Sequence, residues 1–396
     1  MNVLRRIYLI LLLTCSCWTV SARDSVRFSL LTCSPGEEIY ELFGHTAVRY
    51  RNITTGEDLV INYGIFDFDT PNFILRFVRG ETDYMMGITP FRYFINSYTM
   101  RGSSVLEQQL DLTTGEANKL DSLFRVNYLP SNRIYRYNYF YDNCTTRARD
   151  RIEEALADSL FYSAIEEGTT YRQWVKRCTE GHPWADFGIN LCLGAEADKS
   201  LNNRQQMFLP MNLQQAFSQA VVLRDSVSRN LVFNEAYLLD PCAENNPQDG
   251  LEITPMQTAW TLFLVVLLLS LLEWHRRSVW WGIDLLLFSL QGVAGCLIAF
   301  LFFCSVHPTV GSNYLLIILN PLPLFFLPTM LYRIRKGKKD PYDVANLVVL
   351  TLFIAFLPVI PQKISLVIVP LALILWIRSL LHLIVVRAKV VGRQKK

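Results

Sequence analysis

Residues 141–150 read YDNCTTRARD and place a cysteine at the start of a predicted helix. Asn143 is a preferred N-cap residue, and apolar side chains from Ala148 to Leu160 follow it at helical spacing. In the first turn of a helix, the dipole and the unpaired backbone N–H groups favour a thiolate, and the same groups can bind an oxyanion. Cys144 is therefore a candidate nucleophile. The alternative is a small buried residue with no chemical role.

A nucleophilic cysteine needs a general base, and only two histidines lie before residue 256. His45 lies in ELFGHTAVRY, where Gly44 permits close backbone approach and a predicted strand follows. His182 lies in EGHPWADFG, a loop rich in Gly and Pro. A strand supports a catalytic group more rigidly than a loop does, which favours His45.

The front part of the chain mixes strands with helices, which predicts an α+β domain. The strand-length segments with β-branched or aromatic residues are 26–32, 45–51, 59–65, 105–112 and 134–140. A turn at 52–58 separates two of them, and Thr113 with Glu116 forms a capping box that begins a helix. The tail, residues 198–255, is expected to be mostly helical.

Composition divides the chain at residue 255. The whole chain has 396 residues, of which 51% are hydrophobic and 18% charged, against about 25% charged in a soluble domain. Residues 256–396 contain 14 Lys and Arg but 4 Asp and Glu, whereas residues 1–255 contain 24 and 31. These values exclude a disordered chain and disfavour a cytosolic enzyme, and no nucleic-acid partner is expected.

Five apolar stretches in the back part are long enough to cross a bilayer. They are residues 256–272, 280–304, 314–332, 344–360 and 364–386. Lys and Arg concentrate in alternate connectors and in the C-terminal tail, and basic loops mark the cytoplasmic side. We therefore expect a cytoplasmic C-terminus and an extracytoplasmic front domain. Prolines in the third stretch predict a kink.

Two ionisable residues, Asp284 and Arg378, fall inside predicted spans. They could form an intramembrane pair near the cytoplasmic ends of the second and fifth spans. Alternatively, each side chain could extend to the membrane interface on its own, which is the commoner behaviour.

Residues 1–22 have the pattern of a secretory signal peptide, with Arg5 and Arg6 before a short apolar core and small residues at the cleavage site. The alternative is a sixth span, but the apolar run is shorter than the roughly 20 residues that a span needs. The expected mature protein has a periplasmic domain, residues 23–255, and a transmembrane domain, residues 256–396.

The periplasmic domain contains five cysteines, which in an oxidising compartment predicts two disulfides and one free thiol. Loop-like surroundings favour pairing of the four cysteines other than Cys144. These four are Cys33, Cys178, Cys192 and Cys242. His182 with Cys178 and Cys192 hints at a metal site, but a disulfide fits an extracytoplasmic domain better, so no metal and no cofactor are expected.

Three segments resemble the Lnb family of bacterial membrane-bound lipoprotein N-acyltransferases. They are FGHTAVRY at 43–50, NYGIFDFD at 62–69 and YDNCTTRARD at 141–150. The likeness covers nearly the whole chain, and the order of His before Cys is also similar to circularly permuted papain-like folds such as NlpC/P60 proteins. The resemblance implies a papain-like periplasmic domain followed by a five-helix transmembrane domain.

The same resemblance implies roles for particular residues. Cys144 corresponds to the nucleophile and His45 to the general base. A papain-like fold places an orienting residue on the strand after the histidine strand, which points to Asn62, with Tyr63 and Asp67 as alternatives.

The implied reaction moves a fatty acyl chain from a membrane phospholipid, through a Cys144 thioester, to the α-amino group of the lipidated N-terminal cysteine of an apolipoprotein. The expected location is the bacterial inner membrane. Two alternatives stay open: an anchored NlpC/P60-type cysteine peptidase or amidase acting on cell-wall peptides, and a membrane protein without enzymatic activity.

The stretch 71–102 combines Phe and Met side chains with four arginines. Apolar anchors next to cations suit the phosphate level of a bilayer or an acyl-binding groove. The alternative is a pair of helices packed on the sheet.

Overall fold

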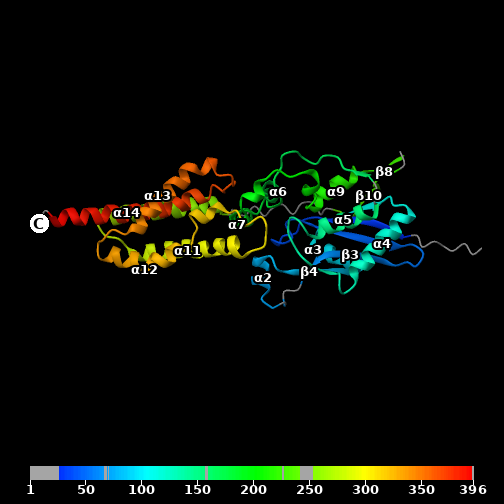
Figure 1. The fold of residues 1–396 in the computed structure, drawn as a ribbon, viewed down its shortest axis with the longest axis horizontal. Helices are drawn as coiled ribbons and strands as arrows, with labels where there is room; N and C mark the ends of the chain where they lie inside the picture. Colours follow the sequence, from blue (N-terminus) through cyan, green and yellow to red (C-terminus); the bar gives the residue numbers. More distant parts are fainter. Residues whose placement is uncertain are drawn as a thin grey trace, which may run out of the picture.

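The computed structural model describes residues 26–66, 69, 71–156, 159–224, 227–240 and 253–394. The predicted signal peptide, Asp67 and Cys242 lie outside these residues. The described chain forms an α+β domain and a bundle of long helices, joined end to end in an elongated molecule (Figure 1). The predicted combination of an α+β domain and five membrane-length helices is confirmed.

A seven-stranded antiparallel sheet lies at the centre of the α+β domain, in the order β10-β5-β1-β2-β3-β4-β6. Its strands are β1 (Val26–Cys33), β2 (His45–Asn52), β3 (Asp58–Ile65), β4 (Asp83–Pro90), β5 (Val105–Leu110), β6 (Ile134–Arg136) and β10 (Val232–Leu239). The strands β1, β2, β3 and β5 lie where the sequence predicted them, whereas β6 is shorter than the predicted segment. The predicted turn joins β2 to β3. There the side-chain oxygen Oδ1 of Asn52 accepts the backbone N–H groups of Thr54 and Thr55.

Several strands were not predicted. The stretch 71–102 contains β4 between α2 (Phe73–Arg79) and α3 (Phe91–Arg101), so it is not a simple pair of helices. The prediction of a mostly helical tail is wrong. After α8 (Asn203–Gln206) and α9 (Pro210–Ser218), the tail forms β8 (Val221–Arg224), β9 (Val227–Asn230) and β10. Because β10 is an edge strand with mostly exposed side chains, its sequence lacks the apolar alternation that marks a half-buried strand.

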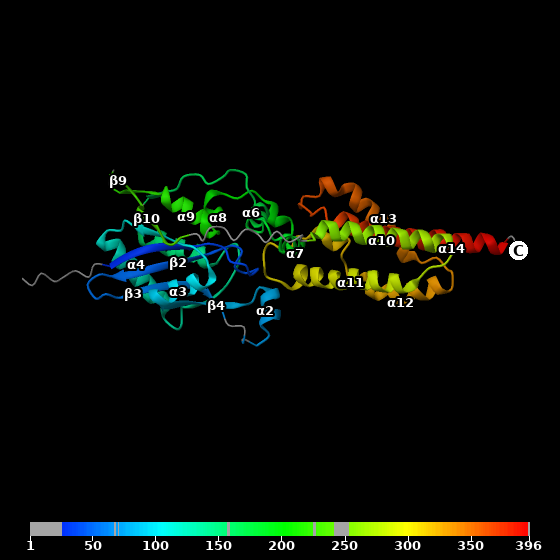
Figure 2. The ribbon, with the colours of Figure 1, turned by 180° about the vertical axis from the view of Figure 1, so that it is seen from behind.

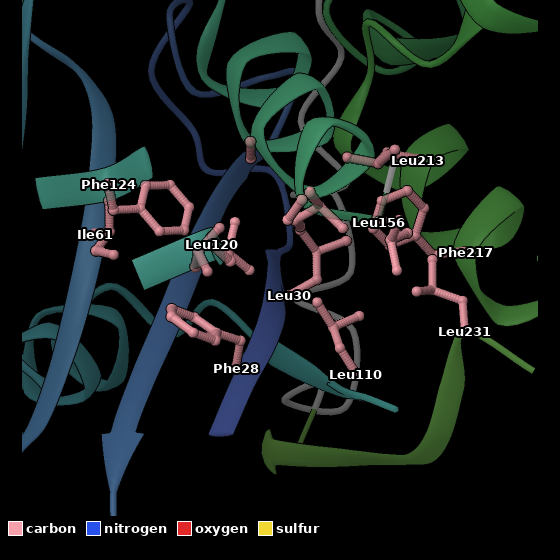
Figure 3. Packing of buried hydrophobic residues seen from close by; sticks show 14 of the residues in the cluster. Phe28, Leu30, Ile61, Leu110, Leu120, Phe124, Leu156, Leu213, Phe217 and Leu231 are labelled. Atoms are coloured by element: carbon pink, nitrogen blue, oxygen red, sulfur yellow. The ribbon is translucent and has the colours of Figure 1, made fainter. Parts of the chain in front are cut away.

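Helices cover both faces of the sheet. They are α4 (Thr114–Tyr128) and α5 (Cys144–Leu156) on one face and α3 on the other. On the first face, Phe28 of β1 packs against Phe124 of α4 with ring centroids 5.9 Å apart (Figure 3). The predicted capping box begins α4, since Thr113 and Glu116 exchange side-chain-to-backbone hydrogen bonds. The other face buries Phe94 of α3.

A smaller helical lobe lies beside the sheet at the end nearer the membrane helices. It consists of α6 (Tyr171–Cys178), α7 (Pro183–Cys192) and the 3₁₀ turn η1 (Ala195–Asp198). Its core contains Trp174 and Phe208, together with Leu42 and Phe43 from the loop between β1 and β2. This packing fixes the loop that precedes His45.

The five membrane-length helices follow the tail. They are α10 (Pro255–His275), α11 (Trp281–Cys304), α12 (Leu322–Arg335) with the preceding turn η2 (Tyr314–Ile317), α13 (Pro341–Phe356) and α14 (Ile368–Gln394). α10 and α13 pack along α14, and α11 packs along α12 (Figure 1). The third span is interrupted between Ile317 and Leu322, where the Asn320 backbone lies against Gly295 so closely that a Cβ on that glycine would clash. The predicted kink is confirmed.

Asp284 and Arg378 form a buried ion pair, with Arg378 Nε donating to Asp284 Oδ1 at 2.7 Å. Arg378 also contacts Glu273, and His382 bridges Asp284 at 3.0 Å and Asp343 at 2.9 Å. The cluster therefore joins α10, α11, α13 and α14. The alternative in which each side chain extends separately to the interface is wrong.

The lobe is bonded to the outer loops of the helical bundle. Asn313 Nδ2 donates to the Leu191 carbonyl at 2.8 Å, and Gln362 Nε2 donates to the Leu193 carbonyl at 2.9 Å. The Lys363 backbone N–H donates to Asp198 at 3.0 Å. These bonds come from two separate loops, so the α+β domain has a defined position on the bundle.

Candidate active site

The start of α5 is built by Asn143. Its Oδ1 accepts the backbone N–H groups of Thr145 and Thr146, both at 2.9 Å, as an N-cap residue should. Its Nδ2 donates to the carbonyl oxygens of Tyr139 and Phe208, so the cap is itself held on two sides. This geometry makes Cys144 the first residue of the helix.

The structure brings Cys144, His45 and Asn62 together. His45 is the first residue of β2, and Asn62 of β3 pairs with Ala47 two residues further along β2. His45 Nε2 lies 3.2 Å from Asn62 Oδ1, which leaves Nδ1 as the ring nitrogen that can face the Cys144 thiol. His45 and Cys144 lie close enough for each to shift the pKa of the other.

Two threonines fasten the helix to the strand beside the thiol. The Thr46 and Thr145 hydroxyls are 3.0 Å apart and buried, which joins β2 to α5 one residue beyond the site on each element. The Thr145 hydroxyl lies 3.8 Å from the Cys144 sulfur, and the Thr46 backbone N–H is close enough to the sulfur to lower the pKa of the thiol. Neither threonine was singled out from the sequence, because their proximity depends on packing between distant segments.

The electrostatics favour a charged pair. Burial opposes ionisation of Cys144, but the adjacent His45 charge and the hydrogen bonds from His45, the Thr46 N–H and Thr145 outweigh it and lower the thiol pKa to about 7. Burial likewise opposes protonation of His45, but the Cys144 charge and the bonds to Cys144 and Asn62 raise the imidazole pKa above its usual value. A thiolate next to an imidazolium is therefore favoured near neutral pH.

Gly64 of β3 lies beside Cys144. Its φ is +85°, and a Cβ added there would meet the Cys144 Cβ and the Tyr137 ring, each at 3.8 Å. Any side chain at this position would be strained and would cover the nucleophile. The glycine follows Asn62 in the segment NYG, and a sequence alone does not show that it faces the thiol.

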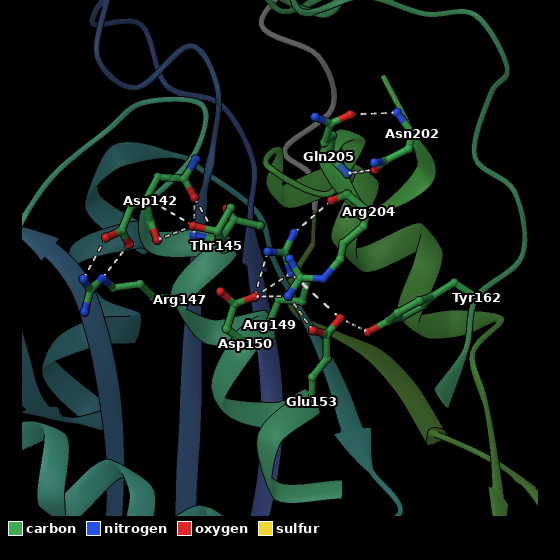
Figure 4. A network of polar contacts seen from close by, with 12 residues as sticks. Asp142, Thr145, Arg147, Arg149, Asp150, Glu153, Tyr162, Asn202, Arg204 and Gln205 are labelled. Atoms are coloured by element: carbon green, nitrogen blue, oxygen red, sulfur yellow. Dashed lines mark hydrogen bonds and ion pairs between the residues drawn. The ribbon is translucent and has the colours of Figure 1, made fainter. Parts of the chain in front are cut away.

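Tyr63 and His182, the alternatives offered by the sequence, and Asp142, the residue two positions before Cys144, have other contacts. Tyr63 is buried and donates to Asn127 Oδ1 at 2.5 Å, away from His45. Asp142 forms a two-point ion pair with Arg147 at 2.6 and 2.8 Å, at the edge of a polar network along α5 (Figure 4). His182 precedes Pro183 at the start of α7 in the lobe, so His45 is the histidine that contacts Cys144.

The predicted disulfides are not formed among the residues that the structure describes. Cys33, Cys178 and Cys192 are free thiols, as is Cys144. Cys33 is buried at the end of β1 beside Tyr98, and burial raises its pKa to about 12. Cys178 and Cys192 end separate helices rather than lying in facing loops. The prediction treated these helical and strand positions as loop-like, which is where it failed.

No group of three His, Cys, Asp or Glu side chains is placed to hold a metal ion within the described ranges. The hinted site at His182, Cys178 and Cys192 is therefore not assembled. The chemistry available at Cys144 is that of a thiol, an imidazole and an amide.

Such a chain belongs to the class of membrane-bound proteins in which an α+β domain with a cysteine–histidine site is followed by a bundle of transmembrane helices. The family model of the Lnb N-terminal periplasmic domain matches residues 18–177, and that of the Lnb transmembrane domain matches residues 246–389. The chain belongs to the Lnb family, as a multi-pass inner-membrane protein with a periplasmic N-terminal domain. No curated protein and no solved structure matches it.

Proposed function

We propose that the protein is a lipoprotein N-acyltransferase in which Cys144 is the nucleophile, His45 the general base and Asn62 the residue that orients the imidazole. The observation that carries the proposal is the Cys144–His45–Asn62 arrangement, with a lowered thiol pKa, in a domain bonded directly to a membrane bundle. We further propose that the C-terminus is cytoplasmic, since the basic connectors alternate along the chain.

The first half-reaction breaks an ester. The Cys144 thiolate attacks an acyl carbonyl carbon of a phospholipid, and the oxyanion forms beside the backbone N–H of Cys144, since Asn143 already accepts the N–H groups of Thr145 and Thr146. The tetrahedral intermediate collapses by breaking the C–O bond. His45 gives its proton to the leaving alkoxide, so a lysophospholipid departs and an acyl thioester remains on Cys144.

The second half-reaction makes an amide. The α-amino group of a diacylated apolipoprotein attacks the thioester carbonyl, and His45 accepts a proton from the attacking nitrogen. The C–S bond breaks and the thiolate returns next to the imidazolium. The ester bond supplies the free energy, so the residues of the site need no nucleotide, cofactor or metal for this reaction.

The second candidate is a cysteine peptidase or amidase that acts on wall peptides. It would use the same Cys144 and His45. However, a peptidase needs only one anchor, whereas two outer loops of a five-helix bundle are hydrogen-bonded to the lobe of this domain. That construction favours a lipid substrate.

The test uses the full chain in liposomes with a radiolabelled phospholipid and no acceptor. We expect a hydroxylamine-sensitive acyl group on the peptide that contains Cys144, because a ping-pong enzyme accumulates its intermediate when the second substrate is absent. Adding a diacylated lipopeptide should then transfer the label to its N-terminus, as measured by mass spectrometry. Cleavage of a wall tripeptide without any acylated Cys144 would establish the peptidase instead.

A further inference from the structure

The helix α2 exposes an apolar surface that the protein does not cover. It has no buried residue, and Ile74 is 78% exposed, with Leu75 and Phe77 about half exposed. α3, from the same stretch of sequence, packs Phe94 and Tyr98 into the core. Within 71–102, the interpretation as helices packed on the sheet therefore fits α3 but not α2.

The position of α2 is set by the end of a membrane helix. The Val306 backbone N–H donates to the Arg79 carbonyl at 2.9 Å, and His307 Nε2 lies 3.1 Å from the Phe77 carbonyl. Both partners come two or three residues after Cys304, the last residue of α11. Figures 1 and 2 show α2 beside the end of α11, at the junction of the two parts. The end of a membrane-length helix is where a bilayer interface is expected, so a segment bonded there is expected near that interface.

The basic residues of α2 are of the kind found at a bilayer interface. Arg76 and Arg79 lie on the helix and no acidic residue lies in its first turn. Both guanidinium groups are partly exposed at the surface of the domain. Arg76 pairs with the Asp83 carboxylate and Arg79 with the Glu81 carboxylate. Arginines beside exposed apolar side chains are typical of segments at the phosphate level of a leaflet.

A second segment with exposed apolar side chains directly precedes His45. The loop between β1 and β2 exposes Ile39 and Tyr40, and it ends at His45. Glu41 of this loop accepts from Arg101 at the end of α3, at 2.8 Å. Figure 2 shows this dark-blue loop at the end of the domain that faces the helical bundle.

We propose that α2, together with Ile39 and Tyr40, is immersed in the periplasmic leaflet of the bilayer that contains the five spans. The occupant of the exposed apolar surface is thus lipid, and Ile74, Leu75 and Phe77 contact acyl chains while Arg76 and Arg79 lie among phosphates. The immersion depends on the bond between α2 and the end of α11. Its use, which is to bring lipid esters to Cys144 without their leaving the leaflet, rests on the proposed function.

Photolabelling tests the immersion directly. The full chain is reconstituted in phosphatidylethanolamine and phosphatidylglycerol liposomes that contain a phospholipid with a diazirine in its acyl chain. After irradiation, mass spectrometry should find label on Ile74, Leu75 or Phe77, in addition to the membrane helices. β9 at the far end of the domain, where Val227 is also exposed, should remain unlabelled. Label confined to the membrane helices would overturn the proposal.

A pair of variants gives the matched control. Ile74→Glu with Leu75→Glu should remove the label from α2 and slow acylation of Cys144 from liposomes severalfold, because immersing carboxylates is unfavourable. Val227→Glu should change neither. Alkylation of Cys144 by water-soluble iodoacetamide should stay unchanged in both, which shows that the site is intact. Unchanged labelling of α2 in the double variant would contradict the proposed contact.

The outcome also separates the two proposals. Label on α2 with no acyl group on Cys144 would support the immersed helix and contradict the acyltransferase. An acylated Cys144 with no label on α2 would support the transferase and overturn the immersion.

Discussion

The pair formed by Cys144 and His45 makes a specific prediction about pH. The lowered thiol pKa, about 7, means that Cys144 becomes mainly thiolate as the pH rises through that value, and the raised imidazole pKa keeps His45 protonated to higher pH than an ordinary histidine. In the wild type, alkylation of Cys144 by iodoacetamide should therefore rise as pH increases through about 7. In His45→Ala, the thiol loses the imidazolium charge and the contact with the ring, which are the largest effects that lower its pKa, so the rise should move to higher pH. Identical pH profiles for the two proteins would contradict the ion pair.

Removal of either partner should show that they act as one unit. Cys144→Ala and Cys144→Ser should abolish acyl transfer, because a serine hydroxyl at neutral pH lacks the nucleophilicity of the thiolate. His45→Ala should be nearly as damaging. The double variant should be no slower than either single variant, since the residues of a catalytic unit are not additive. The measurement is the initial rate of N-acylation of a lipopeptide, and a more damaging His182→Ala would mean that the wrong base was assigned.

In the proposed function Asn62 acts only through the ring of His45, so its variants should have smaller effects. Asn62→Ala removes the acceptor at 3.2 Å from Nε2 and should lower the rate constant of acylation by about 10- to 100-fold, the range typical of a lost supporting hydrogen bond. The pH at which alkylation of Cys144 rises should shift upward as well. A purely structural role would lower thermal stability without moving that pH profile.

The sequence predicted the residues of the site better than their surroundings. Cys144 was found from a local signal, the N-cap before a helix, and His45 from its place before a strand. Asn62 followed from the family resemblance. Gly64, Thr46 and Thr145 were missed because their contacts join β2, β3 and α5, and no local pattern reports a register between segments about 100 residues apart. The disulfides were wrong because cysteine counts carry no geometry.

At the scale of elements, variants of two N-cap residues can distinguish an effect on helix stability from an effect on the reactivity of the Cys144 thiol. Thr113→Ala should remove the cap of α4 at a cost of about 1 kcal/mol in stability, and Asn143→Ala should remove the cap of α5 at a larger cost, because it also leaves the Tyr139 and Phe208 carbonyls without their donor. Only Asn143→Ala should also slow alkylation of Cys144, because only that cap positions the thiol. Thermal unfolding and alkylation rates measured on both variants make the comparison. Equal loss of reactivity in both would show that general destabilisation is responsible.

The strands that escaped prediction share a cause. β10 lies at an edge of the sheet, and β8 and β9 form a small sheet with β7 (Ser159–Phe161), so few of their side chains are buried. The hydrophobic pattern is the strongest local signal of a strand, and it disappears when both faces are exposed. By contrast, β1 buries six consecutive residues between α3 and the helices of the other face, and its apolar content was visible.

At the scale of the whole molecule, the buried cluster around Arg378 should contribute strongly to the stability of the helical bundle. Arg378→Ala would leave Asp284 and Glu273 without their cation and should destabilise the protein by about 3–5 kcal/mol. Arg335→Ala, which removes a cation lying 4.0 Å from the Trp281 ring centroid, should cost far less. Thermal denaturation in detergent micelles measures both. Equal effects would mean that the buried cluster contributes no more than a surface contact.

The order of the two parts was readable from composition, since charge and hydropathy change abruptly at residue 255. The contacts between the parts were not. Asn313 and Gln362 are polar residues in short outer loops, and nothing in their neighbourhood shows that they bond to carbonyl groups more than 100 positions earlier. Contacts of this kind depend on the completed fold.

Those two loops have a consequence for which molecules can react. A domain on a flexible tether would vary in its distance from the bilayer. Here the hydrogen bonds between the lobe and the two loops hold Cys144 at a fixed distance from the membrane helices. The distance of a substrate's reactive group from the bilayer can then decide which molecules react. Only acyl and amino groups that reach the distance from the bilayer at which Cys144 is held can react with it, so a group displayed at another distance on a folded protein would not meet the sulfur.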